Sequence, residues 1–122
     1  MIGMSYKKLK VWQEAMELVK EVYELTKSFP REEMYGLISQ MRRAVISVAS
    51  NIAEGSQRVS DKDFGNFLLM SRGSLAELET QRLAALMLNY GNTDLHKCVE
   101  IRGERLSKML HAFHSKLKVH SP

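Results

Sequence analysis

The sequence predicts an all-α fold, a single domain of residues 1–122 built as an antiparallel up-down-up-down four-helix bundle. Apolar residues recur at three- and four-residue steps along four long stretches, as they do on one face of a helix. These stretches span about residues 6–28, 31–54, 61–90 and 94–117. Prolines occur only at positions 30 and 122, so nothing between them breaks a helix strongly. No stretch alternates as a half-buried strand does, and short connections favour antiparallel neighbours.

The first predicted helix begins at Tyr6 and runs to Ser28. Its apolar face consists of Leu9, Trp12, Ala15, Met16, Val19, Val22, Tyr23 and Thr26. Phe29 ends the helix because the residue before a proline is driven out of the helical conformation. Pro30 suits the first turn of the next helix, where acidic residues such as Glu32 and Glu33 are also favourable.

The second predicted helix carries two stripes side by side. The apolar stripe consists of Met34, Ile38, Met41, Val45, Val48 and Ile52. The polar stripe consists of Gln40, Arg43, Ser47, Asn51 and Glu54, which fall within a sector of roughly 80° at 100° per residue. Small residues are concentrated here, whereas a solvated face usually has long charged residues. The polar stripe therefore predicts close packing against another helix, and Gly55 is the expected end of this helix.

The third predicted helix starts after Ser60, because a serine three residues ahead of an acidic group, here Asp63, can satisfy the free amides of a helix start. Its face consists of Phe64, Phe67, Leu68, Ser71, Leu75, Leu78, Arg82 and Leu86, and Tyr90 brings it to the stop Gly91-Asn92. A glycine inside a helix, Gly73, costs about 1 kcal/mol relative to alanine. Together with Ser74, Gly73 therefore predicts the close approach of a neighbouring helix.

The fourth predicted helix is capped by Thr93 or Asp94. Its apolar face consists of Leu95, Val99, Leu106, Met109, Leu110, Phe113 and Leu117. Arg102 projects toward the same side, where a buried cation needs a partner. The candidate partners are Glu54, Glu77 and Glu79, either within the protomer or across an interface, although the stem of Arg102 could instead lie on the core and carry its head to water.

Positive charge is concentrated at the two ends of the sequence, within a net charge of +4. Residues 1–10 contain three basic and no acidic side chains, and residues 95–122 contain six basic and two acidic ones. Such surfaces attract phosphate backbones, although a charged outer helix face is usually only solvated. The residues expected to contact nucleic acid are Lys7, Lys8, Lys10, Lys97, Arg105 and Lys108.

No catalytic, cofactor-binding or metal-binding residues are expected. The sequence lacks the Glu-x-x-His motifs of di-iron bundles, and it has no phosphate loop, nucleophile elbow or dinucleotide fingerprint. His111 and His114 are interpreted as surface histidines. Cys98 is the only cysteine, and we expect it to be a small core residue in a reducing compartment, the cytoplasm. No membrane span and no site for a small-molecule substrate are expected.

A series of short motifs resembles the bacterial four-helix-bundle family named for 23S rRNA intervening sequences. The motifs are Trp12 with Ala15, Val22-Tyr23, Phe29-Pro30, Glu33, Tyr35-Gly36-Leu37, Gln40, Arg42-Arg43-Ala44, Ser47, Asn51-Ile52-Ala53-Glu54-Gly55, Arg58, Phe64, Phe67-Leu68, Gly73-Ser74 and Glu77-Leu78-Glu79. The resemblance implies an antiparallel four-helix protomer that assembles into a ring-like homopentamer. It also implies kinship with the accessory variability proteins of diversity-generating retroelements, which are basic and bind RNA and a reverse transcriptase.

Two functions follow from these expectations. The first is a non-enzymatic homo-oligomer that binds structured RNA, of the kind associated with rRNA, through its basic surface. The alternative is a protein-interaction scaffold without direct nucleic-acid contact. In both cases we expect a packing and oligomer signature that consists of Gln40, Arg43, Ser47, Asn51, Glu54, Gly55, Gly73, Ser74 and Arg102.

Overall fold

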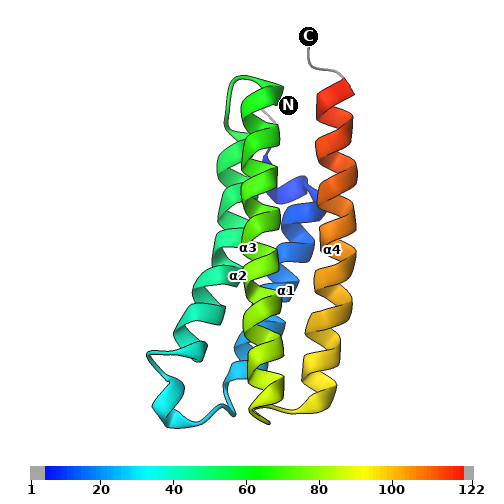
Figure 1. The fold of residues 1–122 in the computed structure, drawn as a ribbon. Helices are drawn as coiled ribbons and strands as arrows, with labels where there is room; N and C mark the ends of the chain where they lie inside the picture. Colours follow the sequence, from blue (N-terminus) through cyan, green and yellow to red (C-terminus); the bar gives the residue numbers. More distant parts are fainter. Residues whose placement is uncertain (1–4, 120–122) are drawn as a thin grey trace.

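The computed structural model describes residues 5–119, and in that range it contains four α-helices and no β-strand (Figure 1). The helices are α1 (Lys10–Thr26), α2 (Leu37–Ser56), α3 (Asp61–Met87) and α4 (Thr93–Val119), with two 3-10 turns, η1 (Tyr6–Lys8) and η2 (Arg31–Glu33). α1 packs against α2, α2 against α3, α3 against α4, and α4 returns to α1. In Figure 1 the α1–α2 and α3–α4 connections lie at the lower end, and the α2–α3 connection lies at the upper end. The predicted all-α class is confirmed.

One hydrophobic core runs along the inside of the four helices. The buried residues on α2 are spaced as the sequence predicts, since Met41, Val45, Val48 and Ile52 are all fully buried. The other helices contribute Ala15, Leu18, Val22, Leu25, Phe64, Leu68, Leu75, Leu78, Val99, Leu106 and Leu110. Burial of such side chains supplies the main stabilising term for the fold. None of the helices in the described part of the chain is both long enough and apolar enough to cross a membrane.

The first helix begins four residues later than predicted. Residues 6–8 form η1, and Leu9 is extended with φ −75° and ψ 127° before α1 starts. Two polar contacts hold this turn. The amide of Lys7 donates to the Ser5 hydroxyl at 3.3 Å, and the Gln13 side chain donates to the Lys7 carbonyl at 2.9 Å. The basic residues at the start of the chain are therefore held on an ordered turn.

The prediction of one continuous helix over residues 31–54 was wrong at its start. η2 ends at Glu33, and α2 begins only at Leu37, whose amide donates to the Glu33 carboxylate at 3.2 Å. That carboxylate satisfies a free amide of the first turn, so a new helix can start there. Met34 and Tyr35 consequently turn outward, 47% and 92% exposed, and Met34 is not part of the core stripe.

α2 also continues past its predicted end, through Gly55 to Ser56. Gly55 is needed inside the helix because α3 approaches it closely. A Cβ atom at this position would lie 2.6 Å from Cβ of Phe67 and 3.0 Å from the Phe64 ring. The close approach that the sequence predicted at Gly73 occurs at Gly55. Gly73 is exposed, and no atom of the described chain lies within 4 Å of its would-be Cβ.

The caps of the last two helices are side chains in the connections. Ser60 accepts from the Asp63 amide at 3.1 Å, as predicted. α3 ends at Met87, three residues before the predicted end, and Asn89 has a positive φ of 61°. The α4 cap is Asn92, not Thr93 or Asp94, because its side-chain oxygen accepts from the amides of Asp94 and Leu95 at 2.8 and 3.1 Å.

Candidate functional site

A cluster of charged side chains joins α1 to α4. Arg102 donates to the carboxylates of Glu21 and Glu14, the latter at 2.6 Å, and Arg105 reaches Glu14 at 3.3 Å. Burial alone lowers the pKa of Arg102, but the hydrogen bonds and charges of Glu21 and Glu14 raise the pKa above its ordinary value. The expectation that Arg102 is paired is confirmed. The partners expected for it, Glu54, Glu77 and Glu79, were wrong because Arg102 faces α1 and not α3.

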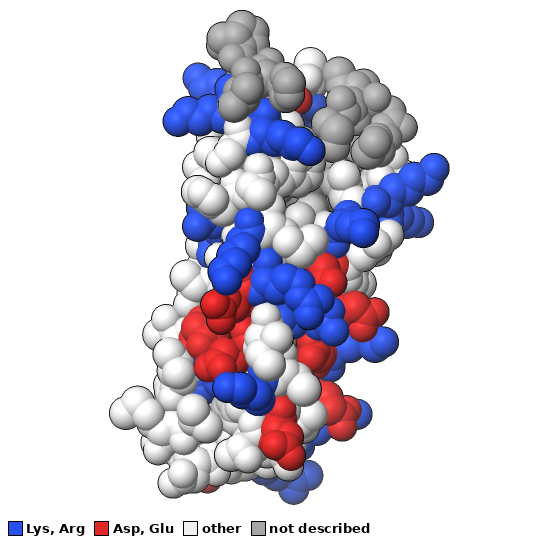
Figure 2. Space-filling view, turned by 90° about the vertical axis from the view of Figure 1, so that its right-hand side faces the viewer, with Lys and Arg blue, Asp and Glu red and all other residues white. Residues whose placement is uncertain are grey.

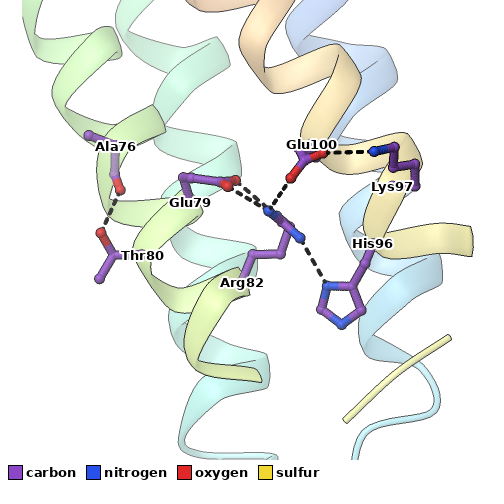
Figure 3. A network of polar contacts seen from close by, with 7 residues as sticks. All are labelled: Ala76, Glu79, Thr80, Arg82, His96, Lys97 and Glu100. Carbon is purple, nitrogen blue, oxygen red and sulfur yellow. Dashed lines mark hydrogen bonds and ion pairs between the residues drawn. The ribbon is translucent and has the colours of Figure 1, made fainter. Parts of the chain in front are cut away.

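A second charged network joins α3 to α4 around Arg82 (Figure 3). The Arg82 side chain is 2% exposed, and it donates to both carboxylate oxygens of Glu79 at 2.5 and 2.9 Å and to Glu100 at 3.1 Å. Its hydrogen bond to Glu79 is the main cause that raises the pKa of Arg82, against the opposing effect of burial. Arg82 lies on the predicted apolar face of its helix. That position was the available sign of a buried ion pair, but only Arg102 was predicted to be paired.

His96 completes the network from the other side of Arg82. Its Nε2 lies 2.8 Å from the carbonyl oxygen of Tyr90, and its Nδ1 lies 3.4 Å from Nη1 of Arg82. A carbonyl can only accept, so Nε2 carries the proton, and Nδ1 accepts from the guanidinium.

The polar stripe of α2 has three different surroundings. At its centre, the Ser47 hydroxyl lies 2.9 Å from that of Ser74 on α3, and Asn51 donates to the Ser47 carbonyl at 2.9 Å. Near its end, Glu54 pairs with Arg58 at 3.0 Å in the solvent. At its start, a polar groove of about 460 Å³ opens between α2 and α3. It is lined by Tyr35, Ser39, Gln40, Arg43, Ala44, Ser47, Ser74 and Glu77. The stripe therefore touches α3 at Ser74, and its first residues remain open to solvent.

Three of the six expected basic contacts lie together at one end of the bundle. Lys7 and Lys8 lie on η1, Lys10 begins α1, and Lys10 shares an apolar groove with Lys116 near the end of α4. Lys116 and Lys118 form the basic last turn of α4 and were not among the expected nucleic-acid contacts. We call Lys7, Lys8, Lys10, Lys116 and Lys118 the cationic end. Figure 2 shows mainly Lys and Arg toward the upper part of this face, whereas Asp and Glu lie among further Lys and Arg in its middle and lower half.

The other expected nucleic-acid contacts differ in position and in pairing. Lys97 lies 11 residues before Lys108, about 16 Å away along α4, and it pairs with Glu100 at 3.4 Å. Arg105 is held by Glu14, whereas the Lys108–Glu104 pair at 3.5 Å is strongly exposed and correspondingly weak. Within residues 5–119, the lysines of the cationic end have no carboxylate within 4 Å. The structure thus separates Lys97 from the other candidates.

The residues considered for chemistry do not converge. Among residues 5–119 no three His, Cys, Asp or Glu side chains are placed to hold a metal ion. His111 contacts Arg72 at 3.3 Å, and His114 packs beside Gly65. Cys98 is exposed, so the prediction that it belongs to the core was wrong. It directly precedes the buried Val99 and lies just outside the buried face of α4.

Two comparisons with known proteins agree with this fold. The family model described as 23S rRNA-intervening sequence protein matches residues 7–112. The chain is similar to the crystal structure of a protein of unknown function from the S23 ribosomal protein family of Bacteroides thetaiotaomicron, with a TM-score of 0.76 and 19% identity over 85% of this chain and 97% of that one. At this identity the likeness shows the fold alone. No curated protein matches the sequence significantly.

Proposed function

Because the chain belongs to the family of 23S rRNA-intervening sequence proteins, we propose that it is a non-enzymatic bundle that binds structured RNA through the cationic end. The observation that carries this proposal is the gathering of five lysines from η1, α1 and α4 without a carboxylate within 4 Å among the described residues. Because the proposed partner is RNA, we propose that the protein acts in the cytoplasm.

The charge distribution favours an elongated polyanion as the partner. After Glu104 the sequence contains no acidic residue, so the last turns of α4 extend the positive surface of the cationic end. Lysine side chains bind phosphates mainly as point charges, and each neutralised phosphate releases counterions. Binding through this surface is therefore largely independent of sequence and sensitive to salt.

We further propose that the chain is a single up-down-up-down antiparallel domain, residues 1–122, that assembles into a ring-like homopentamer. The resemblance to the family supports this assembly, and so do the open polar groove beside Ser74 and the exposed Gly73. Repeating the cationic end around a ring multiplies weak phosphate contacts into a high overall affinity. In this assembly the signature residues Ser47 and Asn51 fix how α2 and α3 pack, and Gln40 and Arg43 at the open start of the stripe face a neighbouring copy.

The RNA proposal is tested by measuring affinity for 23S rRNA fragments at two salt concentrations. We expect binding that weakens with salt. The variant Lys7→Gln/Lys8→Gln/Lys10→Gln removes three phosphate contacts and should lower the slope of log affinity against log salt by about 2 to 3. Lys97→Gln is the matched control, because this lysine lies away from the cationic end. Affinity that ignores salt, or an equal loss in both variants, would argue against the proposal.

A second candidate function is a protein-interaction scaffold in which the lysines serve solubility. The observation in its favour is the number of large apolar side chains exposed on α3, among them Leu69, Met70, Leu83 and Met87. Capture of partners from native cells separates the two functions. Partners released by nuclease treatment indicate RNA, and partners that persist indicate a direct protein contact.

A further inference from the structure

α3 is apolar on its outward face as well as on its buried face. An exposed stripe follows steps of four and three residues and consists of Leu69, Gly73, Ala76, Thr80, Leu83 and Met87. We call these six residues the α3 ridge. At 1.5 Å per residue the ridge is about 27 Å long. The outer face of a surface helix is normally polar, so a helix that is apolar on both sides is expected to be covered on both.

The ridge is most apolar toward its C-terminal end. Leu83 is 45% and Met87 is 83% exposed, and Leu88 beside them is 53% exposed. From Thr80 to Tyr90 the only charged residue is Arg82, which is buried. Contiguous exposed apolar surface of this kind marks an interaction site in soluble proteins.

A second apolar surface lies between α1 and α2, where it forms an open groove. This groove of about 660 Å³ is lined on its apolar side by Tyr23, Met34, Tyr35, Ile38 and Ile46. We call these five residues the α1–α2 groove. The break between η2 and α2 creates the groove, because it turns Met34 and Tyr35 outward. Ile46, in the lining of the groove, is 41% exposed.

Charges at the edges of the two surfaces are opposite in sign. The groove also has Arg42 and Arg43 in its lining. Arg42 stacks on the Tyr23 ring at 4.4 Å and donates to Thr26, and within residues 5–119 neither arginine has a carboxylate within 4 Å. The ridge is flanked by Glu77, which has no cation within that distance in the described chain, and by Glu79, which shares Arg82 with Glu100.

We infer that the α3 ridge of one copy docks into the α1–α2 groove of a second copy of this chain. An exposed apolar stripe thereby meets an apolar groove, and an acidic edge meets a basic edge. Each partner contributes roughly 800 Å² to a standard interface, and a patch of that area is about as wide as the ridge is long, about 27 Å. The two surfaces share no residue, so one copy uses both at once. Such a head-to-tail contact generates a closed ring when the rotation between copies allows it.

This inference rests on the self-association proposed above and goes beyond it, since it names both sides of the contact. It also assigns the main contact to apolar residues outside the polar stripe of α2. A single kind of partner, another copy of this chain, accounts for both apolar surfaces.

The test introduces one charge into each surface. Leu83→Glu blocks the ridge, and Ile46→Glu blocks the groove; both positions are more than 40% exposed, so the bundle itself should tolerate the change. We expect each variant alone to sediment as a 14.0 kDa monomer with unchanged helix content. Ile101→Glu, at an apolar position of α4 that is 51% exposed and outside both surfaces, is the matched control and should assemble as the unchanged protein does.

Mixing the two blocked variants gives the decisive result. Leu83→Glu still has a groove, and Ile46→Glu still has a ridge, so together they should form a dimer of one copy each that cannot grow further. The inference is overturned if the mixture stays monomeric, if Ile46→Glu assembles normally, or if Ile101→Glu disrupts assembly equally. An unchanged protein that is itself monomeric at micromolar concentration overturns both the assembly and this contact. RNA affinity, measured separately, would not be decided by that result.

Discussion

Arg82 on α3 and Glu100 on α4 form an ion pair of 3.1 Å, although the arginine side chain is only 2% exposed. Its second carboxylate, Glu79, comes from one turn earlier on its own helix. The guanidinium is thus removed from water while both carboxylates stay about two-fifths exposed. Taking a cation out of water is costly, so the stability of the folded protein depends on the presence of these two negative charges beside Arg82.

Removing both carboxylates should therefore destabilise the protein strongly. We expect Glu79→Gln/Glu100→Gln to lower the free energy of unfolding by about 3 kcal/mol, because it leaves a buried guanidinium without a compensating charge. Adding Arg82→Met to this variant should restore most of the loss, since methionine has a similar length and needs no partner. Urea unfolding measures all three proteins. A loss below about 0.5 kcal/mol in the double variant would show that water hydrates the Arg82 guanidinium in place of the carboxylates.

The α1–α4 cluster predicts two different coupling energies on one face. Arg102 and Glu21 are about one-quarter exposed, whereas Arg105 is 54% exposed. A double-mutant cycle with Arg102→Met and Glu21→Gln should give a coupling of about 1 to 2 kcal/mol, because burial weakens screening. The corresponding cycle for Arg105 and Glu14 should give less than about 0.5 kcal/mol. Equal couplings would contradict the difference in burial.

Two helical glycines should respond to alanine in opposite directions. Gly55→Ala should cost about 1 to 3 kcal/mol, because the new methyl group would lie 2.6 Å from Cβ of Phe67 and the backbones must move apart. At Gly103 the nearest neighbour of a new Cβ is the Leu75 side chain at 3.9 Å. Gly103→Ala should therefore stabilise the helix by up to about 1 kcal/mol. Thermal unfolding of both variants at one protein concentration tests the contrast, which equal shifts would refute.

Tyr90 makes stability sensitive to alkaline pH. Burial, followed by the negative charges of Glu33 and Glu32, raises the pKa of Tyr90 above its ordinary value of 10.0. The folded state holds the phenol proton more tightly than the unfolded state does. The resulting stability is complete below pH 10.0 and is lost as the pH rises from there through the higher pKa of the folded protein. Between pH 9 and pH 11 the free energy of unfolding should fall more steeply with pH for the unchanged protein than for Tyr90→Phe. Equal slopes would contradict this.

The periodicity of apolar residues was sufficient to predict the four helices and their buried faces. It was misleading at Met34, which stands four residues before Ile38 as a helical stripe requires. The interruption there depends on a hydrogen bond between the Glu33 side chain and the Leu37 amide. Periodicity does not register such a contact. The apolar spacing therefore continued across a turn that places Met34 in solvent.

The candidate site was predictable only in part, because charge along a sequence differs from charge in space. Counting identified both basic ends of the chain, and the fold brings Lys10 and Lys116 to the same groove. The same count included Lys97, which a straight helix keeps at a distance from them. For Arg102 the sequence showed the need for a partner, but α4 borders both α1 and α3. Which of the two supplies the carboxylates follows only from the rotation of α4 about its axis.

Because η1 is closed by Ser5 and by the Gln13 side chain, Lys7 and Lys8 are presented on a backbone that is already ordered. Fixing the backbone of one flexible residue costs about 1 to 2 kcal/mol in conformational entropy. A basic tail incurs that loss for each residue when it binds an anionic surface. Here the loss is met during folding, so an anionic partner gains the attraction of these two lysines at a smaller entropic penalty.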